Sequence, residues 1–464
     1  MTVLLLLASN GLHRGWLIAA LRHAPPELPR APDFQPRVTV QLPLFNEPLV
    51  FHDAIMCLAD LEWPRDRLQI QILDDSTDGT QDQTRALADQ LQEQGIDVEW
   101  RHRVDRSGFK AGALAAGIPT ATGEYIAVFD ADFRPEPSFL QEMMPSFLDA
   151  EVDVVQARWG HLNDKTDALT AAQATLLDGH FMVEHAARFR AGHWFNFNGT
   201  AGIWRKTAIA KGGGWSGDTL TEDLDLSYRT QLAGGRFVLR DDVVAPAELP
   251  PNLMAFRSQQ HRWAKGSLQV ARKLMGPIWS SQASFSQKLE ASTHLLANLS
   301  HPLVVLLAML LPLVPWSRSH TSIWMPPGMD IVVLAFAVLP FVAYYGVGGW
   351  RSNPEDPWRR WRALPAALAL GVGMSVSQAR ATLQGLGGPV GEFVRTPKGG
   401  LSDAARDDAR LGLEASLAVW SIGGALWNGL EGYWGSVPFI VLFATGFTWV
   451  SWRGAEERLA ARRS

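Results

Sequence analysis

The chain has 464 residues, enough for two or more domains, and a formal net charge of −5. No basic domain or run of Lys and Arg indicates nucleic-acid binding. The single cysteine, Cys57, excludes an intrachain disulfide and a cysteine-based zinc site. Charged and apolar stretches alternate up to about residue 273, whereas long apolar runs follow from about residue 295. The sequence therefore predicts an α/β domain followed by a membrane part.

Residues 1–23 form an apolar run that Asn10, His13 and Arg14 interrupt. The run lacks the basic start and the small-x-small cleavage site of a signal peptide, so it predicts a short N-terminal membrane helix. Residues 24–37 are rich in proline and predict a linker, because proline fits neither a helix interior nor a central strand.

Residues 38–273 predict the α/β domain. Short apolar or alternating segments at 38–47, 68–76, 97–103 and 124–132 predict strands, and helical segments lie at 49–62, 79–95 and 108–117. This alternation predicts a Rossmann-like, mostly parallel sheet with helices on both faces. Ligands of such sheets bind beyond the carboxyl ends of the strands, where Asp74 and Asp75, and Asp130 and Asp132, are expected.

Residues 274–464 predict interfacial helices and transmembrane helices. An amphipathic segment at 278–299 is expected at the membrane interface. Apolar segments at 302–316, 329–347, 413–430 and 437–452 are near the length that spans a bilayer. The connector 351–362 and the tail 453–464 are rich in arginine and should both face the cytoplasm. Both can do so if segment 362–384 lies in the membrane plane, which gives one N-terminal and four C-terminal spans.

Four short motifs carry candidate chemistry, and each is weak alone. They are Leu73-Asp74-Asp75-Ser76, Phe129-Asp130-Ala131-Asp132, Leu220-Thr221-Glu222-Asp223 and Gln259-Gln260-His261-Arg262-Trp263. An isolated Asp-x-Asp is often a pair of solvated turn acids, and Thr-Glu-Asp is more often a helix N-terminus. The Gln-x-x-Arg-Trp segment could be an ordinary helix face with a core tryptophan. The informative feature is that all four occur in this order.

With these motifs the chain resembles the family-2 processive β-glycosyltransferases, the cellulose synthase superfamily. It is most similar to the cellulose-synthase-like mannan and glucan synthases and their bacterial relatives. The resemblance rests on VTVQLPLFNE, LQIQILDDSTDGT, GFKAGAL, VFDADFRPE, VVQARW, FNFNGTAGIWR, GGW, TEDLDLSYR and QQHRWAKG, and runs from about Val38 to Lys273. It implies a GT-A type glycosyltransferase domain on the cytosolic side of the cell's inner or plasma membrane.

The resemblance also implies a donor site and its metal. Asp130 and Asp132 would bind Mg²⁺ or Mn²⁺, with Asp130 also beside the donor. The donor site would further comprise Asp74 and Asp75 at the nucleotide, Lys110 and Arg262 at the diphosphate, and Gln259.

The catalytic base and the acceptor site follow from the same resemblance. Asp223 would take the proton of the attacking hydroxyl, since inversion needs a base on the face opposite the leaving diphosphate. Trp263, Glu222, Asn198 and Gly199 would contact the acceptor.

Segment 385–411 contains a gating-like loop. Phe393, Thr396 and Lys398 resemble a Phe-x-x-Thr-x-Lys loop that closes over the nucleotide in cellulose synthase, although Arg395 and Pro397 depart from that pattern. A polar connector is the alternative interpretation.

Two functions remain open, and both use a nucleotide-sugar donor and a lipid bilayer. The first is inverting, metal-dependent transfer of a hexose from a UDP-glucose or GDP-mannose type donor to a growing β-linked polysaccharide, which passes through the membrane. The second is a single β-glycosyl transfer to a lipid such as diacylglycerol. An inactive transporter or scaffold is disfavoured because the expected carboxylates are all present. His180, His185 and His193 near Glu184 are not expected to form a metal cluster.

Overall fold

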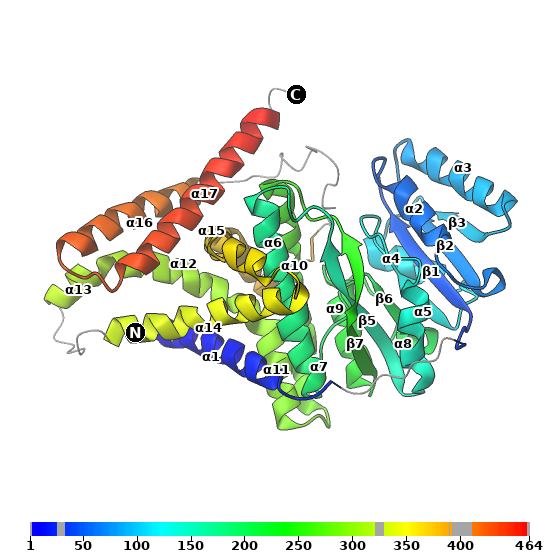
Figure 1. Ribbon diagram of the computed structural model, residues 1–464, viewed down its shortest axis with the longest axis horizontal. Helices are drawn as coiled ribbons and strands as arrows, with labels where there is room; N and C mark the ends of the chain where they lie inside the picture. The colour runs from blue at the N-terminus through cyan, green and yellow to red at the C-terminus, as the bar shows by residue number, and fades with distance from the viewer. Residues whose placement is uncertain (1, 26–32, 321–328, 389, 392–410, 462–464) are drawn as a thin grey trace.

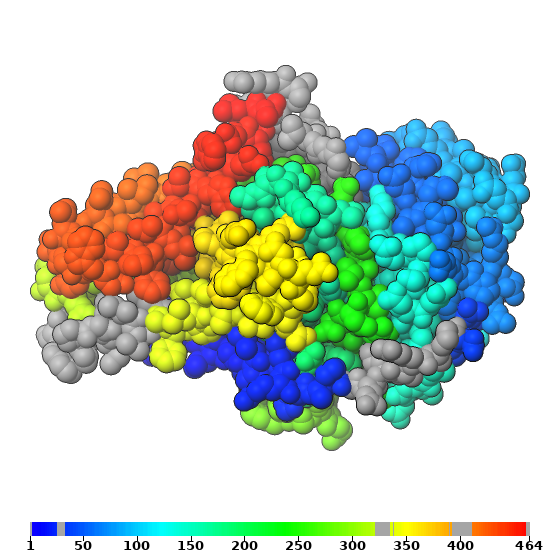
Figure 2. All heavy atoms as spheres, in the orientation of Figure 1, coloured from blue at the N-terminus to red at the C-terminus, as the bar shows by residue number. Residues whose placement is uncertain are grey.

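The computed structural model describes residues 2–25, 33–320, 329–388, 390–391 and 411–461. A sheet with its helices lies on one side of the molecule, and a group of helices from both ends of the chain lies on the other (Figure 1). In the space-filling view the two parts form one continuous body (Figure 2).

The predicted strands of the first half are confirmed. They are β1 (Val38–Leu44), β2 (Leu68–Asp74), β3 (Asp97–His102) and β4 (Tyr125–Val128), all parallel. The helices between them are α2 (Phe51–Ala59), α3 (Thr80–Glu93) and α4 (Phe109–Gly117), close to the predicted segments. The carboxyl ends of β1, β2 and β4 therefore meet at one edge of the sheet.

The second half of the sheet was not predicted strand by strand. It contains β5 (Val152–His161), β6 (Gly202–Arg205) and β7 (Arg236–Ala247), and the full order is β3-β2-β1-β4-β6-β5-β7. Strand β6 runs antiparallel to both β4 and β5, so the sheet is mixed. An entirely parallel sheet would have been wrong at β6, because four residues are too few to show a strand pattern in the sequence.

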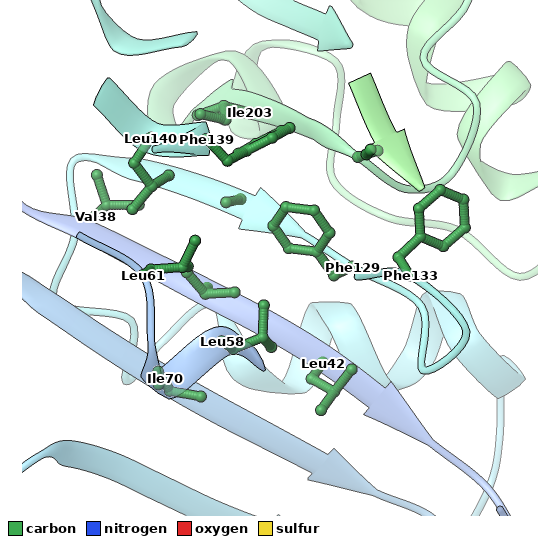
Figure 3. Close-up of a cluster of buried hydrophobic side chains, with 14 of the residues drawn as sticks. Val38, Leu42, Leu58, Leu61, Ile70, Phe129, Phe133, Phe139, Leu140 and Ile203 are labelled. Atoms are coloured by element: carbon green, nitrogen blue, oxygen red, sulfur yellow. The ribbon is translucent and has the colours of Figure 1, made fainter. Parts of the chain in front are cut away.

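The main hydrophobic core lies on one face of β1. Leu42 packs with Leu58 of α2, Ile70 of β2 and Phe129 after β4 (Figure 3), and all four side chains are buried. Burial of each such side chain stabilises the fold by about 1.5–3 kcal/mol. On the opposite face Gln41 donates a hydrogen bond to Gln71 at 2.9 Å. This packing fixes the strand ends that carry the acidic motifs.

The domain contains several further helices. They are α5 (Phe139–Met143), α6 (Ala168–Gly179), the π-helix η3 (His180–His185), α7 (Ala186–Arg190), α8 (Lys206–Lys211), α9 (Glu222–Leu232) and α10 (Leu253–Ser280). The domain boundary predicted after residue 273 falls inside α10. The helix begins at an Asn252 cap and runs to Ser280. It packs both on the catalytic domain and on the later helices, so it belongs to both parts of the molecule.

The other part of the molecule is helical, as predicted. It contains α1 (Thr2–Ala20), α11 (Phe285–Leu296), α12 (Ser300–Leu310), α13 (Val314–His320), α14 (Met329–Ser352), α15 (Pro357–Gly387), α16 (Gly412–Leu430) and α17 (Val437–Ala461). Among the described residues, two stretches are long and apolar enough to cross a bilayer, Thr2–Ala20 and Phe285–His320. By themselves they are weak evidence for a membrane, so the full set of spans remains a prediction.

Helix α15, which contains segment 362–384, touches the catalytic domain at both ends. Near its start Arg360 pairs with Asp164 at 2.8 Å, and near its end Gln384 lies 3.1 Å from His261. A helix held in this way packs along the catalytic domain, whereas its position relative to a membrane stays a prediction. The Arg-rich ends of α14 and α17 also reach the domain, through Arg351–Asp241 and Arg453–Asp167.

Candidate active site

An open cleft lies at the carboxyl edge of the sheet. Strand ends β1, β2 and β4 form one wall, and α9 and α10 form the other. The lining includes most of the predicted site residues, namely Asp75, Lys110, Asp130, Asp132, Asn198, Gly199, Glu222, Asp223, Gln259, Arg262 and Trp263. The structure therefore brings together residues that lie far apart in the sequence.

Asp74 does not line the cleft. Its side chain is fully buried and accepts hydrogen bonds from the Ser76 backbone at 2.8 Å and from the Thr84 hydroxyl at 2.5 Å. The sequence prediction that Asp74 contacts the nucleotide directly does not fit this geometry. Asp74 instead fixes the turn that presents Asp75, whose carboxylate accepts two hydrogen bonds from Arg103.

Asp130 and Asp132 follow β4 and are both partly exposed. The Asp130 backbone donates to the Thr200 hydroxyl at 2.9 Å, and its carboxylate pairs with Lys110 at 2.6 Å. Lys110 also donates to the Gly199 carbonyl at 2.9 Å. Burial acts to lower the pKa of Lys110, but Asp130 and Glu222 outweigh it and raise that pKa. Lys110 is therefore a fixed cation in the cleft.

Glu222 and Asp223 begin α9, where backbone N–H groups favour negative charge. Asp223 accepts a hydrogen bond from the Leu224 N–H at 2.8 Å. Burial, with a further contribution from the neighbouring Glu222 carboxylate, raises the pKa of Asp223 to about 7. Burial likewise raises the pKa of Glu222. A carboxylate with a pKa near neutrality is suited to accept a proton during turnover.

Helix α10 supplies Gln259, Arg262 and Trp263, which lie three and four residues apart and therefore share one face. The same helix packs closely on the Thr-Glu-Asp loop: a Cβ added to Gly266 would lie 2.5 Å from the Thr221 side chain. Lys273 of α10 also pairs with the buried Asp225 at 2.8 Å. The position of α10 thus sets the position of Asp223.

The charges of the cleft do not balance. Four carboxylates surround Arg262, those of Glu222, Asp130, Asp223 and Asp132, and their attraction opposes the burial that lowers its pKa. Near these four acids lie two cations, Arg262 and Lys110, and over the whole lining seven Asp and Glu side chains face three Lys and Arg side chains. A divalent cation would reduce this excess of negative charge.

The donor set fits such a cation. Asp130 and Asp132 offer the hard carboxylate oxygens that Mg²⁺ and Mn²⁺ prefer, and diphosphate and water commonly complete that coordination. Within the described part of the chain no cluster of three or more His, Cys, Asp or Glu forms a closed metal cage. The two aspartates suit an ion that arrives with a phosphate ligand.

The motifs did not reveal several cleft residues. Phe45 follows β1, and the guanidinium of Arg106 lies 3.3 Å from the centre of its ring. At the other end Trp159 lies 6.2 Å from Trp263, measured between ring centres. Phe45 lies within the first predicted strand segment, 38–47, so its place near the carboxyl edge could have been inferred. Trp159 ends the segment VVQARW, which belongs to the family resemblance, but no role was predicted for it, and Arg106 gave no such signal.

Two other predictions concern residues outside this cleft. Phe393, Thr396 and Lys398 of the gating-like segment lie outside the described residues. His180 lies 3.7 Å from the carboxylate of Glu184, which pairs with Arg188 at 2.8 Å.

Family models and a solved structure match this chain. Residues 39–210 match the family model described as Glycosyl transferase family 2, and residues 125–348 match Glycosyl transferase family group 2. A solved mannosyltransferase from Pyrobaculum calidifontis, in complex with GDP-Man and Mn²⁺, has the same fold. Its TM-score is 0.56 and its identity 18%, over 83% of this chain and 98% of that one.

Curated relatives share more of the sequence. Glucomannan 4-beta-mannosyltransferase 1 of Oryza sativa subsp. japonica is 40% identical over 52% of this chain and 48% of its own length. Glucomannan 4-beta-mannosyltransferase 2 of Arabidopsis thaliana is 42% identical over 52% of this chain and 46% of its own. The chain thus spans about half the length of the curated relatives it matches.

A mixed sheet with acidic strand ends facing a single cleft defines a GT-A type fold. The chain belongs to the family-2 glycosyltransferases, of the cellulose-synthase-like type.

Proposed function

We propose that the cleft transfers a hexose from a nucleotide sugar of the UDP-glucose or GDP-mannose type to a growing β-linked glycan, with inversion at the anomeric carbon. The observation that carries this proposal is the convergence of Lys110, Asp130, Asp223 and Arg262 on one cleft. The names of the curated relatives favour mannose as the transferred sugar.

On the donor side, Lys110 and Arg262 would hold the diphosphate, and Asp75 and Arg106 would face the nucleoside. Asp130 and Asp132 would hold Mg²⁺ or Mn²⁺, which when bound neutralises charge on the departing diphosphate. Lys110 pairs with Asp130 at 2.6 Å in the free cleft. Binding of the donor would therefore exchange this internal pair for contacts to phosphate.

On the acceptor side, Asp223 would act as the general base. Its carboxylate takes the hydroxyl proton of the acceptor while that oxygen bonds to the anomeric carbon, and the bond from this carbon to the diphosphate oxygen breaks. The raised pKa of Asp223 supports this role, because the carboxylate can hold the proton once it is transferred. No covalent intermediate with the protein is needed.

The polymer would leave the cleft past Trp159 and Trp263, whose rings line its acceptor end. Helices α10 and α15 pack together beside this end and join the catalytic domain to the other helices. We propose that these helices form a multi-pass membrane region, with the catalytic domain in the cytosol and the gating-like loop above the nucleotide. Passage of the product through this region is part of the proposal.

A donor panel tests the proposal. Purified protein with Mg²⁺ or Mn²⁺ would be given labelled UDP- and GDP-hexoses, and both nucleoside diphosphate release and product size would be measured. We expect one donor to be used and the label to appear in a β-linked polymer. If the only product is a chloroform-soluble lipid that carries one sugar, the glycolipid function replaces the polymer function.

A further inference from the structure

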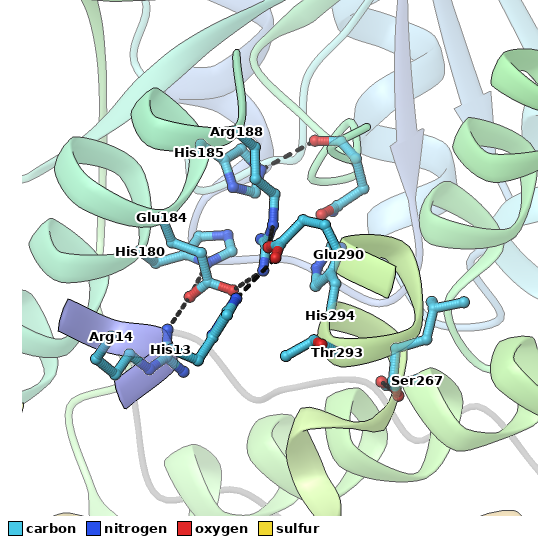
Figure 4. Close-up of polar contacts among 12 residues, drawn as sticks. His13, Arg14, His180, Glu184, His185, Arg188, Ser267, Glu290, Thr293 and His294 are labelled. Carbon is cyan, nitrogen blue, oxygen red and sulfur yellow. Dashed lines mark hydrogen bonds and ion pairs between the residues drawn. The ribbon is translucent and has the colours of Figure 1, made fainter. Parts of the chain in front are cut away.

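Outside the cleft, a group of buried charged side chains joins the catalytic domain to the helical part of the molecule. We call it the junction cluster, and it consists of His13, Arg14, His180, Glu184, Arg188 and Glu290 (Figure 4). Its residues come from α1, the π-helix, α7 and α11. None of them takes part in the proposed transfer reaction.

Glu184 is the centre of the cluster. One carboxylate oxygen accepts from Arg14 of α1 at 2.8 Å and from the Tyr344 hydroxyl of α14 at 3.0 Å. The other oxygen pairs with Arg188 at 2.8 Å, and Arg188 also pairs with Glu290 at 2.8 Å. Arg188 and Glu290 are almost completely buried. Buried charges hold one geometry, because a displaced partner would leave an uncompensated charge.

His180 links this cluster to the active site. One ring nitrogen lies 3.7 Å from the Glu184 carboxylate, and the other lies 3.0 Å from the side-chain oxygen of Asn198. His180 and Glu184 occupy a π-helical turn, a strained form that often marks functional sites. Helix α14 packs directly on the start of this turn, since Gly348 and Gly179 are in close contact.

The turn that contains Asn198 contacts both Lys110, on the proposed donor side, and Asp223, the proposed base. The Gly199 carbonyl accepts from Lys110 at 2.9 Å, and a Cβ at Gly199 would lie 2.9 Å from an Asp223 carboxylate oxygen. Gly199 has a φ of +81°, which glycine adopts without strain. A shift of this turn would therefore move Lys110 relative to Asp223.

We propose that Arg14, Glu184 and His180 form a positioning relay that fixes the Asn198–Gly199 turn, so that the first helix of the chain sets the active-site geometry. Only the expected effect of the relay on turnover depends on the proposed function. None of its members is a catalytic residue, since each acts through the turn.

The test uses full-length protein in detergent or nanodiscs, with Arg14→Gln as the probe and Arg22→Gln as the matched control. Arg22 lies just after α1, is exposed, and contacts only the Ala19 carbonyl in the described structure. Hydrogen–deuterium exchange of the peptide that covers residues 196–201 should increase in Arg14→Gln and stay at the wild-type level in Arg22→Gln. Unchanged exchange in Arg14→Gln would overturn the relay.

Turnover gives a second readout. We expect Arg14→Gln to lower kcat by about 10-fold while the KM for the donor stays within about twofold, because the turn positions groups and does not bind the donor. A rise in KM in step with the loss of kcat would contradict positioning. If wild-type protein uses no donor, the proposed function fails, but the exchange experiment still decides on the relay.

Two further variants guard against misfolding. Arg14→Lys keeps the charge and loses the planar fork, and His180→Phe keeps a ring but removes both nitrogens. His180→Phe leaves Arg14 and Glu184 paired, so loosening of the 196–201 peptide in this variant would place His180 in the relay. Wild-type exchange in His180→Phe would end the relay at Glu184 and overturn it.

Discussion

The cleft and the junction cluster both gather charged side chains, but they balance them differently. In the junction cluster, Arg14 and Arg188 match Glu184 and Glu290, and the partners lie 2.8 Å apart. In the cleft, four carboxylates surround two cations. A balanced group is complete without a ligand and serves the fold, whereas an unbalanced one costs stability until a ligand arrives. The predictions below test this difference.

The largest effect is expected from substitution of the proposed base, Asp223. Asp223→Asn keeps the shape of the side chain but cannot take a proton, so kcat should fall by about 10³-fold, within the usual range for general bases. Donor affinity, measured by calorimetry, should change little. Release of nucleoside diphosphate at the wild-type rate in this variant would remove Asp223 as the base.

Removal of one balanced charge should affect stability instead. Arg188→Met leaves Glu184 and Glu290 without their shared partner and should lower the free energy of unfolding by about 3–5 kcal/mol. Arg236→Met is the matched control, because Arg236 pairs with Asp149 on the exposed surface and should contribute about 0–1 kcal/mol. Thermal unfolding in detergent measures both. Equal losses in the two variants would contradict the distinction between the buried and exposed pairs.

Loss of a metal ligand should weaken donor binding. Asp132→Ala, or addition of EDTA to the wild type, should raise the donor Kd by about 10–100-fold, since the divalent ion would link the carboxylates to the diphosphate. Asp97→Ala, at an exposed pair with Arg37, serves as the control. Donor affinity that is independent of metal in both proteins would exclude the proposed site.

A substitution where α10 approaches the Thr221-Glu222-Asp223 loop should have a smaller effect. Gly266→Ala places a methyl group against Thr221 and should displace Asp223, lowering kcat by about 10-fold. Gly276→Ala on the same helix meets no atom within 4 Å and should leave kcat unchanged. If the two variants have the same kcat, α10 does not set the position of the base.

The smallest effect is a pH dependence of stability. Burial raises the pKa of Asp223 from 3.8 to about 7, so the folded protein binds this proton more tightly than the unfolded chain. The contribution of Asp223 to the stability of the wild type in EDTA should therefore decline as the pH rises from about 4 to about 7. Asp223→Asn removes this contribution, and its melting temperature should exceed that of the wild type at pH 8 but not at pH 4. A wild-type advantage at pH 8 would contradict the raised pKa.

The sequence predicted the first half of the fold well, because β1 to β4 and their helices have strong periodicity. Strand β6 escaped prediction, since its four residues carry no pattern and its antiparallel direction depends on its neighbours. The boundary predicted after Lys273 falls inside α10, which continues seven residues past it as one helix.

The candidate site was predicted through its motifs, and the misses have a physical cause. Asp74 and Asp75 look equivalent in sequence, but Thr84 and Trp100 enclose the Asp74 carboxylate. Contacts of this kind depend on side chains from separate elements. The same holds for Glu184, whose partners lie up to 170 residues away in the chain.

The anomeric configuration of the product tests the central claim most directly. An α-linked, labelled nucleotide sugar would be supplied with Mn²⁺, and the new glycosidic bond would be examined by NMR. If Asp223 activates the acceptor on the face opposite the diphosphate, the product is β-linked. An α-linked product would contradict this account of the cleft.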